Sequence, residues 1–145
     1  FVNLKIKVMF RLILLFFFQL AFVQFSAGQN KKDNTIIVNG FVSFNKLKET
    51  LLKEGFTSFN YDTVFVTAAG RPLGNSNALK QTYVIIRTDS SLSFTGFIVF
   101  GEDKNYSSGM LLENRYGYSK KGFFIMNKIC ASFGFPLVYT KEADF

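Results

Sequence analysis

The chain has 145 residues, a formal net charge of +7, one cysteine and no histidine. This length suits one domain of ordinary size. A single cysteine excludes an internal disulfide, and the missing histidine removes the commonest general base and transition-metal ligand. The composition therefore argues against disulfide-stapled scaffolds and excludes papain-type cysteine catalysis.

The N-terminal region has the pattern of a secretory signal peptide. Arg11 gives it a basic start, residues 12–23 are an apolar run, and Ser26 and Gly28 are small residues suited to cleavage. The apolar run is shorter than the roughly 20 residues that a spanning helix needs. We therefore expect cleavage rather than anchoring.

We predict initiation at Met9, because the chain opens with Phe1, and a signal peptide over residues 1–28 with the mature start at Gln29. Cleavage removes three of seventeen basic residues and none of the ten acidic ones, which leaves a net charge of +4. This modest excess does not indicate nucleic-acid binding. The protein is expected to be exported, to the periplasm or the extracellular space, and to meet the membrane only if the segment stays uncleaved.

A short polar leader, residues 29–40, is predicted before a single domain at 41–145. A helix is expected within 42–56, where apolar residues recur at helical spacing. Ser43 is a suitable N-cap, and Gly55 is a suitable residue just after the last turn.

The apolar pattern then changes to a period of two, which is typical of strands. Four strands are predicted, over residues 56–60, 63–69, 81–88 and 91–100. A polar loop separates the two pairs at 70–78, and residues 35–38 are a brief β-prone run. Residues 101–118 read as a long loop with room for a short strand at 110–112.

The closing helix is predicted over residues 119–133, with Ser119 as N-cap and Gly134 after its end. Cys130 falls on its apolar face, so we expect a buried and unreactive thiol. The predicted fold is α+β: a four-stranded antiparallel sheet with two helices packed on one face, in the order α-β-β-β-β-α.

The opposite face of this helix carries Lys120, Lys121, Phe124 and Lys128. Together with Arg115, in the preceding loop, these are the candidate binding residues. Phe124 is an aromatic side chain among lysines. Either it is covered by another segment or is an ordinary scattered apolar residue, or it contacts an anionic partner or a lipid surface. No catalytic residue is proposed.

No other motif in the sequence indicates a nucleotide or calcium site. The loop 70–76 lacks the GK[ST] ending of a phosphate-binding loop, and no calcium-loop pattern accompanies Glu102 and Asp103. The Asn105 sequon matters only in a eukaryotic secretory pathway. No metal or cofactor is expected, although folding can still bring together a carboxylate pair from distant positions.

Two segments carry a family resemblance: residues 51–69, a helix end followed by Gly-Phe and two strands, and residues 113–134, an Asn-Arg loop that leads into the closing helix. In these the chain resembles small uncharacterised envelope proteins and lipoproteins of Gram-negative bacteria. The resemblance implies two helices on one face of an antiparallel sheet, and no activity. Because no cysteine lies near residues 26–30, a lipid anchor is not expected.

The leading hypothesis is a non-catalytic exported envelope protein that acts as a binding or structural module. Its partner is another envelope protein or an anionic surface. One alternative is an inhibitor or immunity-like protein with one tight protein partner, and another is a small carboxylate-based hydrolase.

Overall fold

Seven strands and two helices make up the part of the chain that the computed structural model describes, residues 29–100 and 109–141. The elements are β1 (Thr35–Val38), α2 (Phe44–Lys53), β2 (Ser58–Tyr61), β3 (Phe65–Leu73), β4 (Ser76–Arg87), β5 (Leu92–Phe100), β6 (Gly109–Leu111), α3 (Gly117–Ala131) and β7 (Leu137–Thr140). The predicted signal peptide, Glu102 with Asp103, and the Asn105 sequon lie outside these residues.

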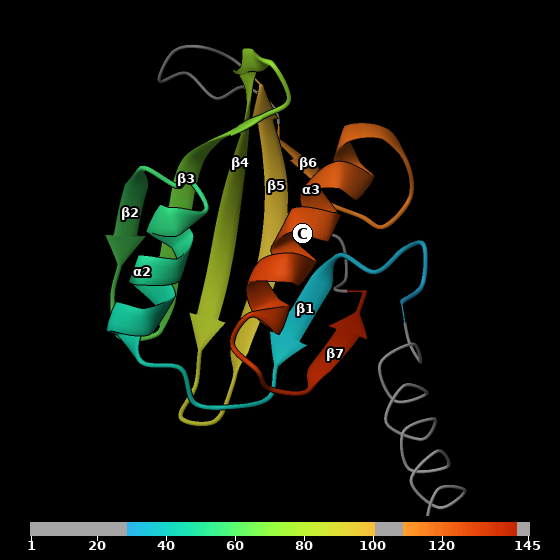
Figure 1. Cartoon of the computed structure of the whole chain (residues 1–145). Helices are drawn as coiled ribbons and strands as arrows, with labels where there is room; N and C mark the ends of the chain where they lie inside the picture. The colour runs from blue at the N-terminus through green and yellow to red at the C-terminus, as the bar shows by residue number, and fades with distance from the viewer. Residues whose placement is uncertain (1–28, 101–108, 142–145) are drawn as a thin grey trace, which may run out of the picture.

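All strand pairs are antiparallel and form one sheet in the order β2-β3-β4-β5-β1-β7, with β6 also pairing with β5. Both helices lie on the same side of this sheet, α2 over β2 and β3, and α3 over β5 and β1 (Figure 1). The α+β class with an antiparallel sheet and two helices is confirmed. The predicted number of four strands is wrong.

Two strands that were not among the four predicted ones complete the sheet beside β5. β1 (Thr35–Val38) coincides with the β-prone run noted at residues 35–38, whereas β7 was not predicted. β1 lies inside the range 29–40 that was expected to be a leader, and Ile36 pairs with Phe94 on one side and Tyr139 on the other. Ile36 and Phe94 are fully buried. The leader range therefore supplies an inner strand, and β7 covers it as the edge strand.

The predicted loop at 70–78 is instead the far end of a long β3–β4 hairpin. Gly70 has a φ of 92°, and the pairing shifts register between Ala69 and Arg71, as in a β-bulge. The bulge lets both strands continue to a tight turn at Gly74, where φ is 81°. The polar composition of this segment reflects a hairpin end rather than an irregular loop.

Helix α2 begins and ends as the sequence predicts. The Ser43 hydroxyl accepts a hydrogen bond from the N–H of Lys46 at 3.3 Å. At the other end Gly55 has a φ of 93°, and the N–H of Phe56 donates to the Leu51 carbonyl at 3.1 Å. This is the Schellman pattern that ends a helix at glycine.

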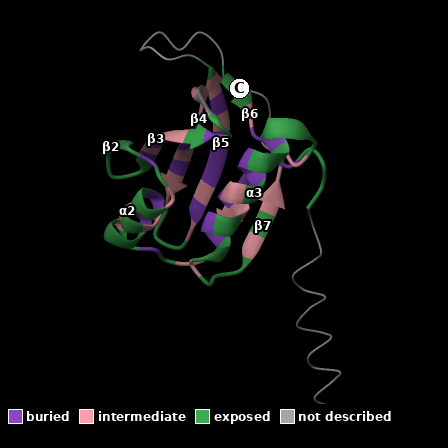
Figure 2. Cartoon of the chain, turned by 45° about the horizontal axis from the view of Figure 1, so that its top comes forward, coloured by how far each residue is buried: buried purple, intermediate pink, exposed green. Residues whose placement is uncertain are grey.

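The core lies between the two helices and the sheet, as the buried residues in Figure 2 show. Leu112, just after β6, occupies a space that two glycines leave open. A Cβ added at Gly96 of β5 would lie 2.5 Å from Leu112 Cδ1, and one at Gly122 of α3 would lie 2.5 Å from Leu112 Cδ2. Both separations are far below van der Waals contact. The two glycines therefore let α3 pack closely on the sheet with Leu112 between them.

We expect Gly122→Ala to destabilise the domain by about 1–3 kcal/mol, the usual cost of overpacking. The added methyl would overlap Leu112, and this outweighs the roughly 1 kcal/mol by which alanine favours a helix interior over glycine. Urea unfolding of the variant measures the effect, with Lys121→Ala on the exposed side of α3 as the control. In a Leu112→Ala background the cost should disappear, which a double-mutant cycle detects. Stabilisation by Gly122→Ala alone would contradict the close packing.

Candidate functional site

Helix α3 places the predicted binding residues on one exposed face. Its buried side consists of Ser119, Gly122, Phe123, Met126, Ile129 and Cys130. At about 100° per residue the opposite side carries Lys120, Lys121, Phe124 and Lys128, and all four are exposed. The helical periodicity read from the sequence therefore placed these four residues correctly.

Phe124 is 67% exposed, so no described segment covers it. Tyr116, at the N-cap position of α3, is 76% exposed. It precedes Lys120 by four residues and Phe124 by eight, a spacing that aligns the three along the helix. We call Tyr116, Lys120, Lys121, Phe124 and Lys128 the basic–aromatic face.

Tyr116 was missed by the sequence analysis because the helix starts earlier than expected. The first helical residue is Gly117, not Ser119. A helix beginning at residue 117 brings Tyr116 and Tyr118 to the end of the exposed face. Tyr118 lies to one side, and its ring would contact a Cβ added at Gly74 in the β3–β4 turn at 3.3 Å.

Ion pairs divide the four predicted basic residues into two groups. Arg115 Nε lies 3.1 Å from Glu113 Oε2, and Lys128 Nζ lies 3.5 Å from Glu54 Oε1. Within the described part of the chain, Lys120 and Lys121 form no ion pair. The cations that remain for a partner are therefore the two lysines beside Phe124.

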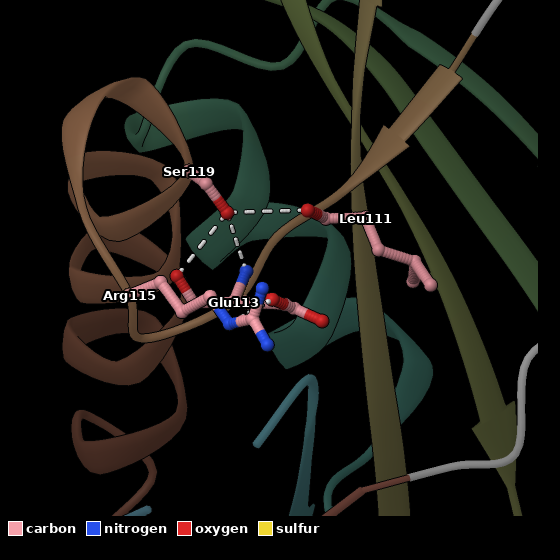
Figure 3. A network of polar contacts seen from close by, with 4 residues as sticks. All are labelled: Leu111, Glu113, Arg115 and Ser119. Carbon is pink, nitrogen blue, oxygen red and sulfur yellow. Dashed lines mark hydrogen bonds and ion pairs between the residues drawn. The ribbon is translucent and has the colours of Figure 1, made fainter. Parts of the chain in front are cut away.

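Ser119 was predicted to cap α3, but it lies inside the helix. Its side chain instead holds the segment before the helix (Figure 3). Its hydroxyl accepts a hydrogen bond from the Glu113 N–H at 2.6 Å and lies 3.2 Å from the carbonyl oxygens of Leu111 and Glu113. Because a hydroxyl has one proton, it donates to one of these carbonyls at a time. These bonds fix the turn that presents Arg115 and its Glu113 partner.

The cysteine is part of the core, as expected. Cys130 is fully buried, and loss of solvation raises the pKa of its thiol well above the ordinary value. Burial also raises the pKa of Tyr83, with a smaller contribution from Cys130. A neutral thiol of this kind is a poor nucleophile.

Polar groups near the other helix have structural partners. Arg71 Nε, in the region first considered as a phosphate loop, donates to the Glu54 carbonyl at 2.6 Å at the end of α2. The Tyr83 hydroxyl donates to Gln81 Oε1 at 3.2 Å inside the core. Among the residues that the structure describes, no three Cys, Asp or Glu side chains are grouped as metal ligands would be.

Comparisons with protein-family models, with curated proteins and with solved structures found no match to this chain. The resemblance to envelope proteins therefore stays a prediction. Over residues 29–100 and 109–141, no helix has the length and apolar character needed to cross a bilayer.

Proposed function

We propose that this protein is an exported, non-catalytic binding module whose interface is the basic–aromatic face of α3. The observation that carries the proposal is the exposure of Phe124 beside two lysines that have no ion-pair partner in the described structure. Aromatic surface that stays in water does not contribute to folding. An exposed apolar group rimmed by polar residues is typical of an interaction site.

Single exposed apolar residues are common and need no function. The alignment of Tyr116, Lys120 and Phe124 along one side of α3 is what distinguishes this surface. By contrast Phe41, in the connection between β1 and α2, is 65% exposed, close to the 67% of Phe124. Phe41 is therefore a matched control for exposure alone.

The test is site-specific photo-crosslinking in cells that express the full chain. A benzophenone amino acid replaces Phe124 in one variant and Phe41 in another. We expect a discrete adduct from position 124 that disappears with Lys120→Gln/Lys121→Gln, and none from position 41. Identical products from both positions, or none from position 124, would overturn the proposed interface.

Export is tested on the same cells by fractionation and N-terminal sequencing. A product that begins at or near Gln29 in the periplasm or medium is the expected result. A cytoplasmic product that retains the segment before Gln29 would contradict export, whatever the crosslinking shows.

A further inference from the structure

Building on the proposed function, we propose that the basic–aromatic face binds the surface of an anionic lipid bilayer. Helix α3 carries three lysines and no acidic residue. Lys128 is paired with Glu54, so Lys120 and Lys121 remain to contact phosphate groups. Tyr116 and Phe124 lie along the helix before and after Lys120, where they can enter the headgroup region while the lysine stems extend to the phosphates.

The kind of cation favours lipid over a protein partner. Protein interfaces are enriched in arginine and depleted in lysine. Next to this face, Arg115 is paired with Glu113, and the two cations of the face without an ion pair in the described structure are lysines. Lysine is a point charge that suits a disordered layer of phosphates and needs no fixed partner geometry.

The first residues of the domain bring further cations close to this face. The Asn114 N–H, just before α3, donates to the carbonyl of Asp33 at 3.3 Å. The first described residues thus run beside the turn that leads into α3 (Figure 1). They include Lys31 and Lys32, both of which are exposed. The start of the expected mature chain therefore adds two exposed lysines close to the proposed lipid-binding face.

The two lysines do not help the helix that carries them. Lys120 and Lys121 are the fourth and fifth residues of α3, near its N-terminal end, where the helix dipole disfavours cations. No acidic residue in the first turn offsets them, and Tyr116 makes no side-chain capping bond. Lys120→Gln/Lys121→Gln should therefore leave the fold intact, so a loss of binding reports on the surface itself.

The experiment is vesicle flotation of the protein recovered from cells that express the full chain. The vesicles are phosphatidylcholine mixed with phosphatidylglycerol, and phosphatidylcholine alone. We expect binding to the anionic vesicles only. At about 1 kcal/mol for each lysine near an anionic surface, Lys120→Gln/Lys121→Gln should weaken partitioning about 30-fold. Phe124→Ser should also weaken it, and Phe41→Ser should not.

Salt gives a second readout, because screening shortens the reach of surface charge from about 10 Å at 0.1 M to about 3 Å at 1 M. Binding that persists unchanged in high salt, equals that to neutral vesicles, or falls equally with Phe41→Ser would overturn the inference. If no vesicle is bound but position 124 still crosslinks to a protein in cells, the lipid inference fails and the binding module stands. If both experiments are negative, both proposals fail.

Discussion

Replacing Phe94 by alanine is expected to destabilise the domain by about 3–5 kcal/mol, the range for removing a buried phenylalanine side chain. Phe94 is fully buried on the side of β5 that faces the helices. Its ring centroid lies 6.4 Å from that of Tyr83 and 6.2 Å from that of Phe133, two residues after the end of α3. Its loss would leave a cavity between β4, β5 and α3. Because small domains have only about 5–15 kcal/mol of stability, the variant should be close to unfolding.

The matched control is Phe65→Ala. Phe65 is 49% exposed and lies in the same cross-strand row as Ile86 and Ser93, on the opposite side of the sheet from Phe94. Its removal should cost less than about 1 kcal/mol, as for most surface changes. Urea unfolding of both variants gives the comparison. Equal losses would contradict the burial of one face of the sheet and the exposure of the other.

The first part of β5 could be predicted because it shows the period of a strand. Leu92 and Phe94 alternate with Ser93, and both apolar residues are buried. The alternation ends at Gly96, and Thr95 is buried although it is polar. Helix α2 could also be predicted from the sequence, since Ser43 and Gly55 mark its two ends. In each case the signal lies within about ten residues of sequence.

The two strands left out of the predicted sheet, β1 and β7, depend on distant partners. Each has four residues, and although residues 35–38 are β-prone, so short a run does not show which strands it pairs with. Thr35 pairs with Thr95, sixty residues later, and with Thr140 at the far end of the domain. Such pairings are set by tertiary packing rather than by local preference. The sequence therefore indicated the class of the fold but not the width of its sheet.

The same distinction applies to the candidate site. Helical spacing was enough to place Lys120, Lys121 and Phe124 on one face. It could not show that Lys128 is paired, because Glu54 lies at the end of α2, 3.5 Å away in space but far along the chain. Nor could it show that Arg115 is engaged by Glu113, since this depends on a turn held by Ser119.

Raising the pH above about 9 is expected to destabilise the domain through Cys130, since a solvated thiol titrates near pH 8.5. Burial raises the pKa of Cys130 well above this value in the folded state. The thiol therefore stays protonated when folded and loses its proton when unfolded. Its contribution to stability is fully present below the unfolded pKa. It falls by about 1.4 kcal/mol per pH unit above that pKa, until the folded pKa is reached.

Urea unfolding at pH 8 and pH 10.5 measures this effect, with Cys130→Ala as the comparison. The linkage relation predicts that the natural protein loses more stability than the variant over this interval, because only the natural protein has a thiol whose pKa is higher in the folded state than in the unfolded state. Tyr83→Phe should remove a smaller part of the loss, because burial also raises the pKa of Tyr83 and a solvated phenol titrates only near pH 10. Because the free energy of unfolding of each protein is compared between two pH values, the packing cost of the substitution cancels. Identical losses in the natural protein and Cys130→Ala would show that the thiol is solvated, and α3 would then have to pack on the sheet through a different face.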